Sequence, residues 1–278
     1  MSGTHRSPPL LLGAVAYDPK VVTIWDGFRR WFADHGLPFD FVLYSNYERQ
    51  TEDLVEGRID VAWHSPLAWV RTRRLVPGAR ALAMRDTDRD LTSVVVVRAD
   101  SPASALGDLA GATVGTGAVD SPQGTLLPLA LFGQTEVRVR RFEVGVGLHG
   151  DHIGGERDAA RALAGGEVDA ACMLDGNHLR FTTEGTLPAA GTRVLAQTRP
   201  FDHCNLSVVA DHPLLDRFVE LLVGMDYADP AARPLMDLEG LTRWLPGRTS
   251  GYDQLEAAVD LARFYDAKGA ITADGYEP

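Results

Sequence analysis

The ten residues HGDHIGGERD, at positions 149–158, bring together two histidines, three acids and an arginine directly before a helical pattern. Histidine titrates near neutral pH, so His149 and His152 could donate or accept a proton beside Asp151. His203 lies in a second polar segment, PFDHCN. We predict that His149, Asp151, His152 and His203 form a catalytic group.

The same segments offer ligands for a transition metal. Imidazole, carboxylate and thiolate are the usual ligands of zinc or iron, and three protein ligands with one open position are typical of a catalytic site. The candidate metal ligands are His149, His152, Glu156, His203 and Cys204. The H-x-x-H spacing is not diagnostic. The alternative is that these side chains cap the helix and hydrogen-bond a ligand directly, with no cofactor.

If this acidic chain binds an anion, it must do so locally, with one or two arginines and with helix N-termini, and Arg157 is an arginine of this segment. Its guanidinium is always charged and presents a fork that suits carboxylate or phosphate. The free N–H groups and the dipole of the following helix favour the same anion. A nucleophilic Cys204 beside His203 is a further alternative, but adjacent strand residues point to opposite faces. Buried, unreactive thiols are the simpler interpretation of Cys172 and Cys204.

The overall composition excludes several classes of partner. The chain has 278 residues, is 45% hydrophobic and carries a net charge of −11, which favours a globular protein and disfavours nucleic acid as a partner. No stretch approaches the roughly 18 apolar residues of a membrane span, so we expect no membrane insertion. The apolar run LLLGAVA is short and predicts a first strand rather than a signal peptide. We therefore expect a cytoplasmic protein.

Short β-rich runs alternate with amphipathic helical runs along the chain. The segment 21–36 has apolar residues at helical spacing, and strands are predicted on either side of it. Ser65 precedes Pro66 at the expected start of another helix, where serine is a good cap. This alternation predicts parallel strands with helices on both faces of the sheets.

Four segments together resemble the type II periplasmic-binding-protein fold, in its phosphonate/phosphite/phosphate branch of ABC-transporter receptors. They are EGRIDVAWHSPLAWV, SVVVVRADSPASALGDLAGATVG, VDSPQGTLLPLALF and ERDAARALAGGEVDAACM. The resemblance implies a two-lobed α/β fold with mixed sheets flanked by helices, two crossover strands and C-terminal helices on lobe 1. Residues 1–97 and 205–278 would form lobe 1, and residues 98–204 would form lobe 2.

The resemblance also implies a ligand cleft beyond the strand ends. The family's hydroxyl-rich anion loop matches Ser121, Pro122, Gln123 and Gly124, and its anion-contacting histidine matches Arg157. Side chains at other strand ends complete the predicted ligand site. The predicted ligand-binding residues are Tyr17, Trp63, His64, Ser65, Ser121, Gln123, Gly124, Arg157, Asp175, Asn177 and His178.

Two functional hypotheses follow. In the first, the chain is an enzyme on this scaffold, a lyase, a hydrolase or a metal-dependent catalyst of oxidative rearrangement, that acts on a small carboxylate- or phosphate-bearing metabolite. In the alternative, it is a non-catalytic binding protein that captures phosphonate, phosphate or another small anion by hinge closure and works with ABC-transporter components or in sensing. The five predicted cleft histidines favour the enzyme, and the family resemblance favours the binding protein.

Overall fold

The computed structural model describes residues 8–143 and 153–276, so His149, Asp151 and His152 lie outside the described residues. The chain divides into two compact units. The first unit contains the residues up to Arg89 together with Cys204–Thr249, and the second contains Asp90–His203 together with the residues from Ser250 onward. We describe each unit by itself.

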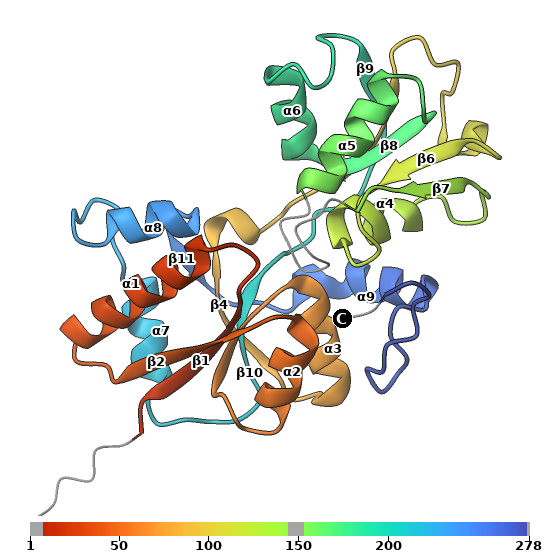
Figure 1. The fold of residues 1–278 in the computed structure, drawn as a ribbon. Coiled ribbons are helices and arrows are strands. Elements are labelled where there is room, and N and C mark those ends of the chain that lie inside the picture. Colours follow the sequence, from red (N-terminus) through yellow and green to blue (C-terminus); the bar gives the residue numbers. More distant parts are fainter. Residues whose placement is uncertain (1–7, 144–152, 277–278) are drawn as a thin grey trace, which may run out of the picture. The chain divides into compact units, whose positions relative to one another are not determined.

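The first unit is built on a mixed six-stranded sheet (Figure 1). Its strand order is β11-β4-β10-β3-β1-β2, in which β1 is parallel to β2 and β3, and β10 is antiparallel to β3 and β4. The strands are β1 Leu10–Val15, β2 Phe39–Tyr44, β3 Val61–His64, β4 Arg80–Arg85, β10 Asn205–Val208 and β11 Trp244–Pro246. The helices are α1 Lys20–Asp34, α2 Tyr47–Val55, α3 Pro66–Leu75, α7 Leu215–Val223 and α8 Arg233–Glu239.

The core of the first unit forms because the apolar residues of α1 recur at helical spacing. Ile24, Trp25, Phe28 and Phe32 are all buried on one face of this helix. They join a single apolar cluster with the strands and with α7, in which the Phe32 and Phe218 rings lie 5.2 Å apart. Burial of this face accounts for the position of α1 against the sheet.

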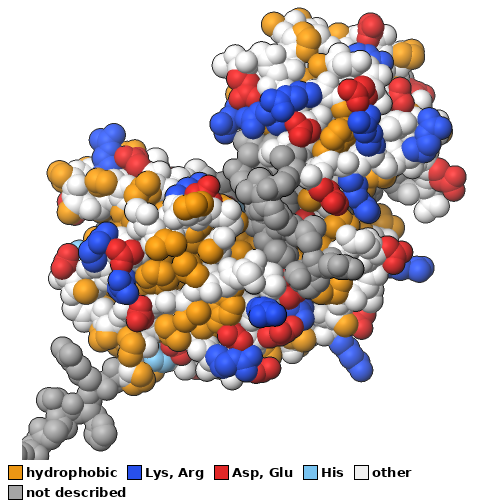
Figure 2. Space-filling view, viewed as in Figure 1, with side chains coloured by type: hydrophobic (Ala, Val, Ile, Leu, Met, Phe, Trp, Pro, Cys, Tyr) orange, Lys and Arg blue, Asp and Glu red, His pale blue; other side chains and the backbone are white. Residues whose placement is uncertain are grey.

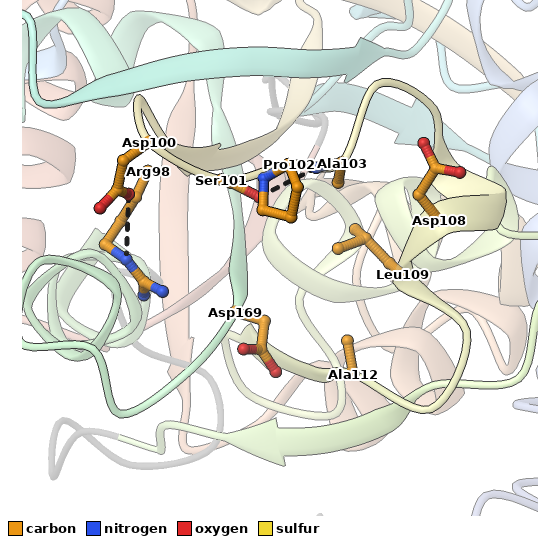
Figure 3. Close-up of a pocket in the computed structure, with 9 residues that line it drawn as sticks. All are labelled: Arg98, Asp100, Ser101, Pro102, Ala103, Asp108, Leu109, Ala112 and Asp169. Atoms are coloured by element: carbon orange, nitrogen blue, oxygen red, sulfur yellow. Dashed lines mark hydrogen bonds and ion pairs between the residues drawn. The ribbon is translucent and has the colours of Figure 1, made fainter.

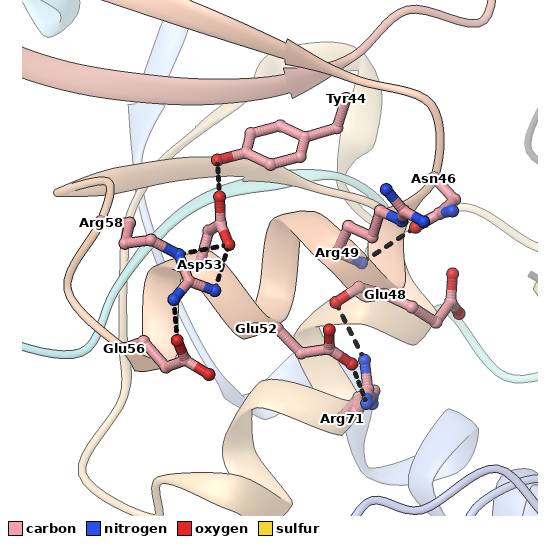
Figure 4. Close-up of polar contacts among 9 residues, drawn as sticks. All are labelled: Tyr44, Asn46, Glu48, Arg49, Glu52, Asp53, Glu56, Arg58 and Arg71. Atoms are coloured by element: carbon pink, nitrogen blue, oxygen red, sulfur yellow. Dashed lines mark hydrogen bonds and ion pairs between the residues drawn. The ribbon is translucent and has the colours of Figure 1, made fainter.

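Polar contacts fasten α2 to its neighbours (Figure 4). Asn46 caps the helix, because its side chain accepts a hydrogen bond from the Arg49 N–H at 2.9 Å. On α3, the Arg71 guanidinium donates to the Glu48 carbonyl at 3.1 Å and to Glu52 at 3.2 Å. These bonds hold α3, whose N-cap residue is Ser65, one of the predicted ligand-binding residues.

The second unit contains a five-stranded mixed sheet with the order β7-β6-β8-β5-β9. Val94–Val97 of its central strand β5 are all fully buried, because helices cover both faces. The strands are β5 Ser93–Arg98, β6 Thr113–Thr116, β7 Arg138–Arg141, β8 Ala170–Leu174 and β9 Thr192–Gln197. The helices are α4 Leu127–Ala130, α5 Ile153–Ala164, α6 Asp175–Thr183 and α9 Asp253–Leu261. The short helical turns of this unit are η2 Leu106–Leu109, η3 Pro122–Leu126 and η4 Ser250–Tyr252. A further short turn, η1 Asp86–Asp88, belongs to the first unit.

The C-terminal segment differs from the predicted division of the chain. The family resemblance implies that all of residues 205–278 lie in the first lobe, whereas the structure groups the residues from Ser250 onward with the second unit. The reason is the packing of α9, which contacts α4 and η3 of that unit. The helices α7 and α8 belong to the first unit.

The surface carries charges of both signs. On the face seen in Figure 2, Lys and Arg side chains alternate with Asp and Glu, and the coloured residues form no broad basic area. A nucleic-acid backbone requires such an area. Among the described residues, no helix has the length and apolar character needed to cross a membrane.

Candidate functional site

The candidate site of the second unit is centred on the η3 loop, which we define as residues 117–126. This loop follows the carboxyl end of β6 and is closed by local hydrogen bonds: the Gly117 N–H donates to the Gly124 carbonyl at 3.1 Å, and the Ser121 hydroxyl accepts from the Gly124 N–H at 3.0 Å. Ser121 therefore caps η3. The loop is compact, and Ser121, Gln123 and Gly124 are buried within the second unit.

Glu156, at the start of α5, lies directly against this loop. A Cβ added at Gly124 would lie 3.0 Å from the Glu156 Cγ, so the side chain packs closely on this glycine. The Glu156 Oε2 accepts hydrogen bonds from the Leu174 N–H and from the Asn177 amide, each at 2.8 Å. Glu156 thus connects the η3 loop to the end of β8 and the start of α6.

His203 also belongs to this cluster. Its Nε2 lies 3.4 Å from the Gln123 Oε1, across 80 positions of sequence. The structure therefore brings together six of the residues predicted from sequence, within one unit: Ser121, Gln123, Gly124, Glu156, Asn177 and His203. Chemically, they offer amide and imidazole groups next to a carboxylate.

The predicted ligand residues of the first unit have different surroundings. Trp63 is 6% exposed, and its ring centroid lies 5.8 Å from that of Trp244, so it packs in the core. His64 is fully buried, and burial followed by the charge of Arg71 lowers its pKa to about 3, so it is neutral at physiological pH. Ser65 caps α3 through a 3.3 Å bond from the Ala68 N–H.

Tyr17 is partly exposed after β1, beside the Lys20 ammonium at 5.8 Å from its ring centroid. On α6 of the second unit, Asp175 is exposed, and the His178 Nε2 lies 3.2 Å from the Thr192 hydroxyl. Burial lowers the pKa of His178. The ligand roles of Tyr17, Asp175 and His178 remain predictions.

Arg157 has a partner other than an anionic ligand. Its Nε donates to the Glu184 Oε1 at 2.8 Å and its Nη2 to the Glu184 Oε2 at 3.3 Å, while its guanidinium covers the Phe181 ring at 5.0 Å. Bonding to Arg157 lowers the pKa of Glu184 to about 2. Because this carboxylate already neutralises the guanidinium, the predicted anion-clamp role of Arg157 lacks support in the structure.

Sequence reasoning missed a charged cluster in the first unit. The Arg85 Nε and Nη2 donate to the two carboxylate oxygens of Asp88 at 2.6 and 3.0 Å, and its Nη1 donates to the Glu239 backbone carbonyl at 2.8 Å and to the Glu239 Oε1 at 3.3 Å. Asp88 is 2% exposed and Glu239 7%. The i, i+3 spacing of Arg85 and Asp88 is visible in the sequence, but the contact with Glu239 joins residues 154 positions apart.

The buried Glu239 should make stability depend on pH. Burial raises its pKa from 4.5 to about 7. Between these two pH values the carboxyl is therefore mostly neutral in the folded protein and mostly ionised in the unfolded chain. Its contribution to the free energy of unfolding is fully present below pH 4.5, falls by about 3 kcal/mol between pH 4.5 and 7, and is constant above that range. We expect Glu239→Gln to remove this fall in urea unfolding measured at several pH values. An unchanged pH profile would contradict the assignment.

The predicted metal ligands only partly meet. Cys204, in the first unit, has its sulfur within 4.8 Å of an Asp88 carboxylate oxygen, but that carboxylate is already bound by Arg85. Glu156 lies in the second unit and already accepts two hydrogen bonds. The carboxylates therefore fit structural roles better than metal ligation. A zinc or iron ion remains a prediction, because His149 and His152 lie outside the described residues.

A cavity of about 490 Å³ lies at the end of the second unit's sheet that is opposite to the η3 loop (Figure 3). Its lining includes Asp169 and Ala112, which precede β8 and β6, whereas the η3 loop follows β6. The Asp169 carboxylate accepts a bond from the Thr113 N–H at 2.8 Å, and that of Asp108 accepts from the Ser104 N–H at 2.8 Å. Both carboxylates therefore hold backbone N–H groups.

Comparison with known proteins gives a family match. A family model described as "ABC transporter, phosphonate, periplasmic substrate-binding protein" matches residues 14–252. An uncharacterized protein of Haemophilus influenzae is 28% identical over 107 residues, which cover 38% of this chain and 73% of that protein.

Solved structures share the fold. PhnD1 from Prochlorococcus marinus, in complex with methylphosphonate, has a TM-score of 0.65 at 15% identity and covers 91% of this chain and 98% of its own. XAC2383 from Xanthomonas citri, bound to ATP, has a TM-score of 0.69 at 18% identity and covers 92% of this chain and 98% of its own. These findings confirm the predicted type II periplasmic-binding-protein fold and the phosphonate-type resemblance.

The same findings correct two expectations. The predicted cytoplasmic location is wrong, because the matching family is one of periplasmic proteins. A short apolar run that forms the first strand does not indicate in which compartment a protein works. The family match also supports the alternative hypothesis, a substrate-binding protein, rather than the enzyme.

Proposed function

Because the chain belongs to the family of periplasmic substrate-binding proteins of phosphonate ABC transporters, we propose that it binds a small phosphonate or a related phosphate- or carboxylate-bearing anion for such a transporter. The observation that carries this proposal is the family match over residues 14–252, which includes the whole η3 loop. A binding protein needs hydrogen-bond complementarity and hinge closure, and no covalent chemistry.

In this proposal the η3 loop provides neutral hydrogen-bond donors for the ligand. Gln123 carries an amide on a buried turn that the Ser121 cap holds in shape, and the His203 imidazole lies 3.4 Å from that amide oxygen. Asp120 and Glu156 are buried in the same part of the second unit. In this proposal the Gln123 side-chain amide donates to the ligand oxyanion.

Gln123→Ala should weaken ligand binding by about 10-fold or more, because a hydrogen bond to a charged group contributes roughly 1.5–3 kcal/mol. The probes are methylphosphonate, inorganic phosphate and acetate, measured by calorimetry and by thermal shift. A probe at 100 times its Kd should stabilise the wild-type protein by about 2.7 kcal/mol.

The matched control is Gln134→Ala, at an exposed position of the same unit, which should bind as the wild-type protein does. Stabilisation by none of the three probes would contradict the proposed ligand class. Equal affinities for Gln123→Ala and the wild-type protein would remove Gln123 from the binding site.

A further inference from the structure

We infer that the C-terminal residues 250–261, which we name the C-terminal brace, position the η3 loop for ligand binding, with Gly251, Tyr252 and Gln254 as positioning residues. This inference rests on the proposed function. The brace consists of η4 and α9, and it belongs to the second unit together with the loop. None of its residues is among the site residues predicted from sequence.

The brace holds the backbone that carries His203. The Tyr252 hydroxyl donates to the His203 carbonyl at 2.8 Å, and the Gly251 carbonyl accepts from the Asp202 N–H at 2.9 Å. The Gln254 amide forms two bonds with one residue, donating to the Arg199 carbonyl at 2.9 Å and accepting from the Arg199 N–H at 3.2 Å. Four hydrogen bonds thus fix the backbone of residues 199–203.

The brace is also buried against the loop itself. Tyr252, Leu255 and Val259 are fully buried, and α9 packs on η3 and α4. The fit at Gly251 is tight, because an added Cβ would lie 2.1 Å from the Asp202 Cγ. Asp202 is fully buried and its Oδ1 accepts a bond from the Asp90 N–H at 3.2 Å, so it cannot easily move aside.

His203 transmits this fixed position to the loop. Its backbone carbonyl is held by Tyr252, and its ring lies 3.4 Å from the Gln123 side chain, which is the proposed ligand donor. The family match ends at residue 252, whereas α9 begins at Asp253. The helix that packs on the loop therefore follows the matched segment.

The test is Tyr252→Phe, which removes the hydroxyl and keeps the buried ring. The control is Tyr227→Phe in the first unit, where the exposed hydroxyl donates to Asp237. The first measurement is hydrogen exchange without ligand. Loss of one hydrogen bond should speed exchange of the amides of residues 117–126 and 199–204 by about 5-fold in Tyr252→Phe, and not in Tyr227→Phe.

The second measurement is the affinity for methylphosphonate of the wild-type protein, of the single variants and of the double variant. Tyr252→Phe should weaken binding by about 5-fold alone and should have no further effect in a Gln123→Ala protein, because the two substitutions act on one interaction. A purely stabilising role would leave the affinity unchanged and the effects additive.

Unchanged exchange in residues 117–126 would overturn the inference whether or not any ligand binds. Changed exchange with unchanged affinity, in a wild-type protein that binds methylphosphonate, would overturn it as well. Absence of binding by the wild-type protein would instead count against the proposed function, and the exchange measurement would still decide whether the brace positions the loop.

Discussion

Arg85→Met is expected to destabilise the protein by about 3 kcal/mol, because it leaves the buried Asp88 carboxylate without its cation. Arg85 holds both oxygens of Asp88 and one oxygen of Glu239, and those two acids are almost completely buried. Methionine retains much of the side-chain volume, so the effect should arise from lost charge and hydrogen bonds. The measurement is urea unfolding followed by tryptophan fluorescence, since Trp63 lies under the Arg85 guanidinium at 5.1 Å.

The control for this prediction is Arg30→Met on α1. Arg30 pairs with Asp26, but its side chain is 70% exposed, and such surface pairs contribute less than about 1 kcal/mol. Adding Asp88→Asn to Arg85→Met should restore part of the lost stability, because it removes the uncompensated charge. A loss below that of Arg30→Met would show that Asp88 and Glu239 do not depend on Arg85.

Gly155→Ala is expected to destabilise the second unit by about 3 kcal/mol, since the new methyl group would meet fixed backbone. Its Cβ would lie 2.3 Å from the Phe142 carbonyl oxygen and 3.3 Å from the Gly117 Cα. The start of α5 would have to move away from the η3 loop, and Glu156 would move with it. We therefore expect methylphosphonate affinity to fall together with the melting temperature.

The matched control is Gly176→Ala on α6, where an added Cβ meets no atom within 4 Å. Alanine is the better helix former, so this variant should be unchanged or more stable by up to about 1 kcal/mol. Equal melting temperatures for the two variants would show that α5 can begin without contact between Gly155 and Phe142.

Local pattern was sufficient to predict many of the elements and one of their caps. Apolar residues at helical spacing predicted α1, and a serine before a proline predicted the Ser65 cap of α3, which the structure contains. The order of motifs also predicted the fold that the family match and the solved structures confirm. Such features depend on residues only a few positions apart, so periodicity and capping chemistry reveal them.

The sequence by itself determined the fold class, the order of elements and the polar η3 loop of this protein. Only the tertiary structure decided which partner each charged or buried side chain has: Glu184 for Arg157, Arg85 for Glu239, and Tyr252 for the backbone of His203. These pairs join residues 27, 154 and 49 positions apart. No local periodicity encodes such contacts, because they form only when separate helices and strands pack and exclude water from the groups between them.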